Sequence, residues 1–204
     1  MSVSDAQAQR RSRVQLLLIF GLFLIPPVGA WITWQYLGDH GVSDTTNAGT
    51  LVSPARPVRV DGLEVADGKA FDAAGLRGRW TYVVFAPQGC DDRCEQQLYL
   101  TRQVRMAMNK DVRRVQRLLV LGNAPDTGFV RQLDAEHSDL HWVVQAGADQ
   151  RFADQFRGAG YSGNGAQYFL LDPLGNLMMF YDLSTPTKGM MKDLQKLLKI
   201  SQIG

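Results

Sequence analysis

The sequence is short of cysteine, histidine and net charge: its 204 residues include two cysteines and three histidines, with a formal net charge of +2. Residues 1–37 hold three arginines and one aspartate, so 19 of the 22 basic and 19 of the 20 acidic side chains lie beyond them. Proteins that bind nucleic acid need a basic surface to neutralise phosphates. The balanced charge of the remaining chain therefore gives no support for a nucleic-acid partner.

The two cysteines are too few and too close for a disulfide framework. A bond between Cys90 and Cys94 would close so small a loop that it adds little to stability. The pair is therefore a candidate for redox or metal chemistry, and a structural disulfide is the alternative.

Charge is absent altogether from Val14 to Leu37. At about 1.5 Å per helical residue, this run is long enough to cross the roughly 30 Å hydrocarbon core of a bilayer. Trp31, Trp34 and Tyr36 stand near its end, as in the aromatic belt at a membrane interface. The sequence predicts one transmembrane helix over residues 14–37.

The residues before this run indicate its orientation. Arg10, Arg11 and Arg13 precede it, and the positive-inside rule then leaves residues 1–13 in the cytoplasm. The chain after Leu37 would lie outside, in a compartment where disulfides persist. A cleaved signal peptide is the alternative, but its apolar region would be only about 7–15 residues, before a small-residue cleavage site. The longer run with its aromatic end favours an uncleaved anchor.

The stretch around the cysteines indicates a strand, a loop and a helix. Trp80–Phe85 is a β-branched and aromatic run bounded by glycine and proline, which is typical of a buried strand. Asp92, with Glu95 three residues on, predicts the start of a helix. Cys90 then lies in the loop and Cys94 in the first helical turn.

The spacing of the two thiols allows them to meet. Cβ atoms four residues apart in a regular helix are about 5–6 Å apart, whereas a disulfide needs roughly 3.5–4.5 Å. With Cys90 in the loop the gap can close, so the pair can cycle between dithiol and disulfide or hold a soft metal. A helix N-terminus favours a thiolate, but Asp91, Asp92 and Glu95 oppose it. We expect a moderately reducing disulfide rather than a strong oxidant.

The rest of the chain alternates strands and helices after a polar linker. Residues 38–57 are predicted as the linker and 58–204 as one domain, with Asp67-Gly68 as a turn near its start. The further predicted elements are helix 93–108, strand 116–121, a helix from Asp126 or Thr127 to 136, strand 140–144, helix 150–156, hairpin strands 167–171 and 177–181, and a helix opening at Thr185-Pro186. This order predicts an α/β sandwich with a central mixed sheet flanked by helices.

Basic residues gather in the segment 102–117. They are predicted to form a solvated face, and a surface that docks on an anionic membrane or an acidic partner is the alternative. The six residues are Arg102, Arg105, Lys110, Arg113, Arg114 and Arg117.

The strand, loop, Cys-x-x-x-Cys and helix, preceded by Leu-Arg-Gly-Arg-Trp at 76–80, resemble the thioredoxin-like Sco/SenC family. Cys90, Asp92 and Cys94 match its motif, and the Leu-Asp-Pro of 171–173 also resembles it. The resemblance implies a thioredoxin-like fold. It also implies a membrane-anchored assembly factor that serves the copper site of cytochrome c oxidase.

The resemblance breaks at the metal site. Asn164 stands where the family has a third copper ligand, a histidine, and an amide oxygen is a poor ligand for Cu(I). Copper is therefore implied only as weakly held Cu(I), bound by Cys90 and Cys94. The histidines of the chain are predicted to be surface or packing residues: His40, His137 and His141.

Three functions remain open. The first is a Sco-like assembly factor, anchored in the bacterial inner membrane by one helix, with a periplasmic domain that serves a respiratory haem–copper oxidase. It would act by thiol–disulfide exchange or transient Cu(I) handling, on an oxidase subunit or other assembly factors. The second is a general periplasmic thiol–disulfide oxidoreductase. The third is a non-enzymatic interaction module with a structural disulfide.

The two redox functions give the cysteines the same roles. Cys90 would be the exposed, attacking thiol and Cys94 its resolving partner. Oxidoreductases of the thioredoxin type place a cis-proline clamp before the hairpin, and no proline lies between Arg157 and Tyr168. This absence favours the assembly factor over the general oxidoreductase.

Overall fold

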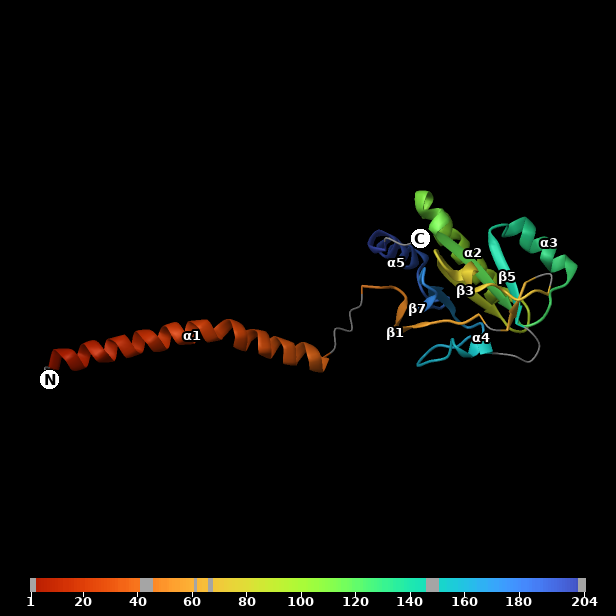
Figure 1. Ribbon diagram of the computed structural model, residues 1–204. Coiled ribbons are helices and arrows are strands. Elements are labelled where there is room, and N and C mark those ends of the chain that lie inside the picture. Colours follow the sequence, from red (N-terminus) through yellow and green to blue (C-terminus); the bar gives the residue numbers. More distant parts are fainter. Residues whose placement is uncertain (1–2, 41–45, 61, 66–67, 146–150, 202–204) are drawn as a thin grey trace. The chain divides into compact units, whose positions relative to one another are not determined.

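Figure 1 shows the computed structural model, which divides the chain into two units, Met1–Thr46 and Asn47–Gly204. It describes residues 3–40, 46–60, 62–65, 68–145 and 151–201. In the first unit, helix α1 runs from Val3 to His40. Within α1, Arg13–Tyr36 is long and apolar enough to cross a membrane, and no other described stretch is. The predicted span of residues 14–37 coincides with it to within one residue at each end.

The apolar side chains of this helix are exposed. Large side chains from Val14 to Tyr36 have exposed fractions between 45% and 79%. An apolar surface of this extent is unfavourable in water, whereas in lipid a helix satisfies its own backbone hydrogen bonds and its side chains match the solvent. This exposure suits a candidate membrane span.

The second unit is built on one seven-stranded mixed sheet. Strands β3, β4 and β5 pair in parallel, and the other neighbours pair antiparallel. The order across the sheet is β1 (Thr50–Pro57), β7 (Asn176–Tyr181), β6 (Tyr168–Leu171), β3 (Trp80–Ala86), β4 (Val115–Leu121), β5 (Leu140–Gln145) and β2 (Leu63–Glu64). The predicted central mixed sheet and the β6–β7 hairpin are confirmed.

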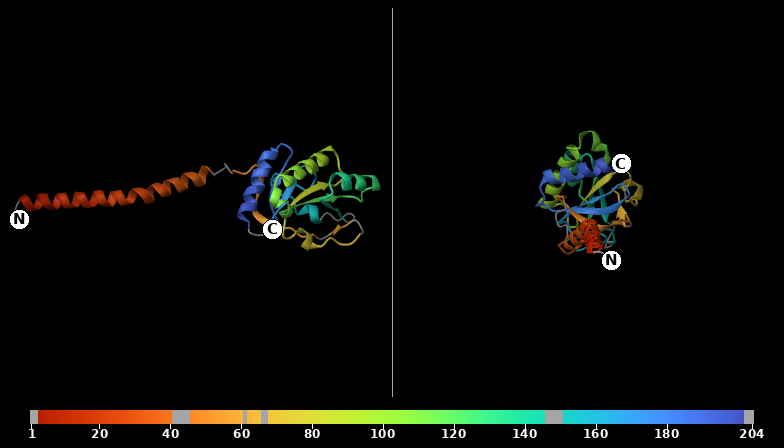
Figure 2. Two further views of the ribbon diagram at one scale, coloured as in Figure 1. Left: turned by 90° about the horizontal axis from the view of Figure 1, so that it is seen from above. Right: turned by 90° about the vertical axis from the view of Figure 1, so that its left-hand side faces the viewer.

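Both faces of the middle strand β3 are covered, which is why all seven of its residues are buried. Tyr82 and Val84 face α2 (Asp92–Met106), α3 (Thr127–Glu136) and α5 (Thr187–Ile200). Val83 and Phe85 belong to the opposite face, with α4 (Arg151–Asp154) and the 3-10 turn η1 (Ala73–Leu76). Figures 1 and 2 show α2, α3 and α5 on one side of the sheet and α4 on the other. A strand buried on both faces has no polar alternation, so its sequence is a continuous apolar run.

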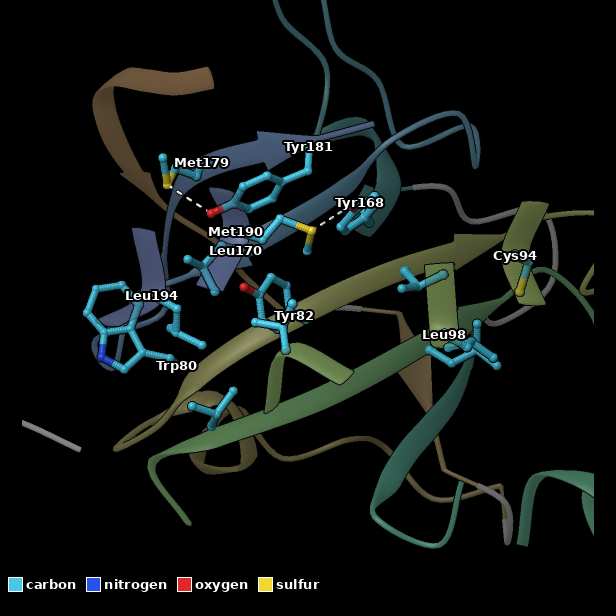
Figure 3. Packing of buried hydrophobic residues seen from close by; sticks show 14 of the residues in the cluster. Trp80, Tyr82, Cys94, Leu98, Tyr168, Leu170, Met179, Tyr181, Met190 and Leu194 are labelled. Atoms are coloured by element: carbon cyan, nitrogen blue, oxygen red, sulfur yellow. Dashed lines mark hydrogen bonds between the residues drawn. The ribbon is translucent and has the colours of Figure 1, made fainter. Parts of the chain in front are cut away.

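Three tyrosines pack inside the face that α2 and α5 cover (Figure 3). The ring centroids of Tyr82 and Tyr181 lie 6.2 Å apart, and the rings of Tyr168 and Tyr181 stack at 5.7 Å. The Tyr168 hydroxyl donates to the sulfur of Met190 at 3.1 Å, and the Tyr181 hydroxyl donates to that of Met179 at 3.3 Å. Burial raises the pKa of all three hydroxyls, so they stay neutral. The cluster joins β7 and α5 to the centre of the sheet.

Strand β1 occupies part of the range predicted as a linker. Thr50 pairs with Phe180 of β7, so the sheet begins at residue 50 rather than after Pro57. The carboxylate of Asp193, on the buried side of α5, accepts hydrogen bonds from the N–H groups of Ala48 and Gly49, at 2.9 Å each. An edge strand is paired on one side only and tolerates proline, so this segment lacks the apolar pattern of a strand.

Two predicted features fall partly outside the described residues. Asp67 of the predicted turn lies outside them. Before it, β2 pairs with β5, and Glu64 forms an isolated bridge with Ala70, which follows it. Gln150, the predicted start of a helix, also lies outside them, and α4 begins at Arg151.

The basic segment 102–117 is not one solvated face. Arg117 is fully buried, and its guanidinium donates to Asp139 at 2.7 and 3.0 Å and to the carbonyl oxygen of Leu98 at 2.9 Å. Arg105 also reaches Asp139, at 3.2 Å. The prediction is wrong for Arg117 because β4 begins at Val115 and places this residue in the sheet under α2. It is wrong for Arg105 because this side chain pairs with Asp139 and donates to the carbonyl oxygen of Val115 at 2.9 Å. The residues of this segment that are exposed are Arg102, Lys110 and Arg113.

Candidate functional site

Helix α2 begins one residue earlier than the sequence predicts. Asp91, not Asp92, is the N-cap: its backbone is extended, and its Oδ1 accepts the N–H of Cys94 at 3.0 Å. Its Oδ2 accepts two hydrogen bonds from Arg93, at 3.0 and 3.1 Å. Both aspartates suit an N-cap, and the sequence does not distinguish them. The cap lies between the cysteines and orients the first turn that carries Cys94.

The cap also keeps a negative charge beside the cysteines. The N–H of Cys94 and, after it, the hydrogen bond from Arg93 hold the pKa of Asp91 below its usual value. Asp91 is therefore ionised at every pH at which thiols exchange. This supports the expectation that the acidic residues of the loop oppose the thiolate.

Cys90 and Cys94 are joined by a disulfide, with their Cα atoms 5.1 Å apart. That separation is within the range that a disulfide spans without backbone distortion. The two sulfurs differ in access: Cys94 is 2% exposed and packs into the core beside Leu98, whereas Cys90 is half-buried at the surface. Figure 3 shows Cys94 at one end of the buried cluster, on the turn before Leu98. Only Cys90 is accessible to the thiol of a partner.

Asn164 lines the same hollow as Cys90. This hollow has a volume of about 480 Å³ and is also lined by Asp91 and Gly165. The side-chain amide of Gln97, on α2, donates to the carbonyl oxygen of Gly165 at 3.1 Å and ties this loop to the cysteine helix. The position that the resemblance assigns to a copper-ligand histidine therefore shares a hollow with Cys90, although it lies 70 positions after Cys94 in the sequence.

The donor set at this hollow is poor for a metal. No group of three histidine, cysteine or carboxylate side chains that could hold an ion occurs among the described residues. The Oδ1 of Asn164 accepts the N–H of Ala166 at 3.1 Å, so the amide serves the local turn. After reduction, two thiolates are the soft ligands available, which suits Cu(I) but not Cu(II).

A second hollow, of about 380 Å³, lies between α2 and α3 and also includes Cys90. Its apolar wall includes Leu98 and Phe129, and His137 lines it as well. The Nδ1 atom of His137 is buried and has no hydrogen-bond partner within the described chain. Burial, and then the charge of Arg117, lower the pKa of this histidine, so its imidazole is neutral at pH 7. The sequence gives no signal for this proximity, because α3 packing against α2 creates it.

A third hollow, of about 700 Å³, is lined by neither cysteine. It lies at the carboxyl ends of β3, β4 and β5, and Asn164 lines it as well as the cysteine hollow. Gln145 lines it too and is 8% exposed. No sequence motif indicated this cavity, because its residues come from separate strand ends and loops.

Comparisons with known proteins agree with this fold. No curated protein matches the chain. Yeast Sco1 with copper bound is 17% identical with a TM-score of 0.55, over 68% of this chain and 90% of that one. Sco1 from Thermus thermophilus is 22% identical with a TM-score of 0.53, over 77% and 99%. BsSco, a Sco-family cytochrome c oxidase assembly protein with a disulfide switch, is 16% identical with a TM-score of 0.52, over 74% and 99%.

These likenesses confirm the predicted Sco-like thioredoxin fold. Residues 80–201 match the family described as transmembrane-like, thioredoxin-like, C-terminal domain. The match runs from the central strand β3 through the cysteine loop and the β6–β7 hairpin to the end of α5. With more than half of its length in this match, the chain belongs to the transmembrane-like, thioredoxin-like C-terminal domain family.

Proposed function

We propose that this protein is a membrane-anchored, Sco-like assembly factor for a respiratory haem–copper oxidase, acting through Cys90 and Cys94. The observation that carries the proposal is the unequal burial of the two bonded sulfurs, with Cys90 accessible and Cys94 2% exposed. Fold relatives support it, because BsSco is an oxidase assembly protein with a disulfide switch and yeast Sco1 has been seen with copper bound.

The proposed topology follows from the candidate span in α1. Residues 1–13 lie in the cytoplasm, residues 14–37 cross the bacterial inner membrane once, and the domain works in the periplasm. This compartment allows the Cys90–Cys94 disulfide to persist between reaction cycles.

The exchange reaction starts from the reduced pair. The Cys90 thiolate attacks one sulfur of the partner's disulfide, forming a mixed disulfide and releasing the partner's other sulfur as a thiolate. The Cys94 thiolate then attacks the Cys90 sulfur, which restores the Cys90–Cys94 bond and releases the partner fully reduced. Two electrons pass to the partner, and a periplasmic dithiol protein must reduce the pair again. Copper-ligand cysteines of the oxidase are the proposed substrate.

Copper is proposed as a transient cargo. The reduced pair offers two thiolates, and Cu(I) accepts such a small, soft ligand set. Because the oxidised pair offers none, oxidation of the two thiolates to the Cys90–Cys94 disulfide, with the partner's disulfide as the electron acceptor, would release the ion to the partner's newly formed thiolates. The same two sulfurs would then bind Cu(I) when reduced and hold no copper when joined in the disulfide.

The test is to trap the partner with a Cys94→Ser variant of the full chain. Without a resolving thiol, the mixed disulfide through Cys90 should accumulate, and mass spectrometry should identify an oxidase subunit or another oxidase assembly factor in it. A Cys90→Ser variant is the control and should trap none, because Cys94 is buried.

Other outcomes distinguish the alternatives. Many unrelated periplasmic proteins trapped on Cys90 would indicate a general thiol–disulfide oxidoreductase. If neither variant traps a partner and the oxidase assembles normally with both cysteines replaced by serine, the disulfide is structural and the proposal is wrong.

A further inference from the structure

The last helix, α5, presents two chemically different sides. Met190, Leu194 and Leu198 are buried against the sheet. The opposite side carries lysines spaced by four, four and three residues, which places them in one stripe along the helix. The four lysines are all exposed: Lys188, Lys192, Lys196 and Lys199. The acidic residue of α5, Asp193, is buried.

The turn η2 (Asn109–Arg114) adds two more basic side chains beside the end of α5. Arg114 donates to the carbonyl oxygen of Leu198 at 3.0 Å, which holds η2 against the helix. Lys110 and Arg113 of η2 are exposed, and Lys110 and Lys199 line one shallow hollow. Asp111 pairs with Arg114 at 3.3 Å, and exposed Asp182 lies before the start of α5. The four lysines of α5 with Lys110 and Arg113 are called the α5 basic face below.

The N-terminal residues of the domain lie against this same helix, α5. The carboxylate of Asp193 accepts hydrogen bonds from the N–H groups of Ala48 and Gly49, so the first residues of the domain lie on α5. Ten residues, 37–46, separate Tyr36, the last of the candidate span, from Asn47. Even fully extended, at about 3.5 Å per residue, they reach no farther than roughly 35 Å. In an anchored protein, the linker therefore meets the domain beside the helix that carries the lysines.

We propose that the α5 basic face docks the domain on the anionic phospholipid headgroups of the membrane that holds its own anchor. Each basic side chain near an anionic bilayer favours docking by about fivefold, and the short tether keeps the local concentration of headgroups high. This inference rests on the proposed membrane anchor, but not on the chemistry of the cysteines.

Docking of this face leaves the cysteines accessible. Cys94 lies in the first turn of α2, and Lys110 follows the last turn. The 15 residues of α2 place these ends about 20 Å apart. The face therefore contacts lipid at the end of α2 remote from Cys90, and the exchange site stays open to a partner protein.

The experiment uses the full chain in lipid nanodiscs and measures the acetylation rate of each lysine by mass spectrometry. In nanodiscs with 30% phosphatidylglycerol, Lys188, Lys192 and Lys199 should react at least fivefold more slowly than in pure phosphatidylcholine. Salt at 0.5 M should remove the difference because it screens the attraction. Lys69, which is exposed beside β2 at the edge of the sheet opposite β1, should react equally in both lipids.

Two double variants, each of which removes two positive charges, test whether protection depends on the α5 basic face. Lys188→Gln/Lys192→Gln should lower the docked-to-undocked ratio about 25-fold, so that Lys199 reacts equally in both lipids. The control Arg131→Gln/Arg157→Gln removes the same charge from exposed residues on α3 and after α4, outside the face, and should keep Lys199 protected. Co-purification with the nanodisc reports the anchor separately.

Equal lysine reactivity in neutral and anionic nanodiscs, with the chain inserted, would overturn the proposal and point to an acidic protein surface as the partner of this face. Protection that the arginine control also abolishes would overturn it as well, because the effect would then belong to net charge rather than to the α5 basic face.

Discussion

Asn164 is the residue at which this chain departs most from the copper-binding pattern that it resembles. The structure places it in the same hollow as Cys90, at the position that the resemblance assigns to a copper-ligand histidine. The amide accepts the N–H of Ala166 and supports the loop instead. A single side chain therefore distinguishes a site with two sulfur ligands from the three-ligand site that the resemblance implies.

An Asn164→His substitution should create a Cu(II) site in the reduced protein. Cu(II) prefers nitrogen or oxygen ligands in addition to sulfur, and an imidazole at this position would supply the missing nitrogen. The expected result is a coloured Cu(II)–thiolate complex, measured by visible absorption after addition of Cu(II). The unmodified protein should show no stable colour and only weak, exchangeable Cu(I) binding that Cys90→Ser abolishes.

A Gln195→His variant is the control, because it adds an exposed histidine on α5 away from the cysteines. It should behave as the unmodified protein does. A tight, coloured Cu(II) complex in the unmodified protein would contradict the prediction. The candidate for the third ligand would then be His137, which lines the other hollow at Cys90 with a buried Nδ1 that has no described partner.

At the scale of elements, α2 is held to the sheet by a buried ion pair. Arg117 of β4 donates to the carbonyl oxygen of Leu98 on α2 and, at 2.7 Å, to Asp139. Burial raises the pKa of Asp139, but the hydrogen bond and charge of Arg117 and the charge of Arg105 outweigh it, and the net pKa is lowered. A guanidinium with no exposed surface depends on this one carboxylate for compensation.

The lowered pKa of Asp139 predicts how stability varies with pH. The unfolded chain protonates this carboxyl at a higher pH than the folded protein does, so its contribution is fully present above about pH 5. The contribution is lost as the pH falls through the lower, folded-state pKa. Urea unfolding between pH 3 and 7 should show this loss.

An Asp139→Ala variant should lose about 3 kcal/mol of unfolding free energy at pH 7, because Arg117 would be buried without a counter-charge. It should also lose less further stability in acid than the unmodified protein. The matched control is Asp154→Ala, which breaks an ion pair with Arg157 whose side chains are 53% and 64% exposed. It should change the unfolding free energy by no more than about 0.5 kcal/mol. Equal effects of both substitutions would show that the pair does not hold α2.

At the scale of the whole molecule, the candidate span in α1 decides where the cysteines work. The arginines before it and the absence of charge within it predict an uncleaved anchor with the domain in the periplasm. A reporter enzyme fused after Gly204 should be active if it requires the periplasm and inactive if it requires the cytoplasm. The opposite pattern, or a mature N-terminus beyond Leu37, would show that the predicted topology is wrong.

The sequence by itself determined the features that depend on neighbouring residues. The candidate membrane span is apparent because charge is absent over a bilayer's length, and β3 because a strand buried on both faces is a continuous apolar run. The cysteine loop, the hairpin β6–β7 and the start of α3 at Asp126 or Thr127 follow from local turn and capping preferences, and the structure selects Asp126 as the cap. Such signals act over a few residues, so one sequence suffices to detect them.

Only the tertiary structure decided which distant residues meet. Asn164 and His137 each line a hollow together with Cys90 because a loop and a helix pack against α2, and nothing near either residue in the sequence encodes that arrangement. Arg117 is buried because its strand lies inside the sheet and Asp139 compensates its charge from 22 residues away. Edge strand β1 needs no apolar pattern, because β7 provides its hydrogen bonds and Asp193 holds the residues before it. Burial and pairing at long range depend on the whole chain, and so they were settled by packing rather than by local preference.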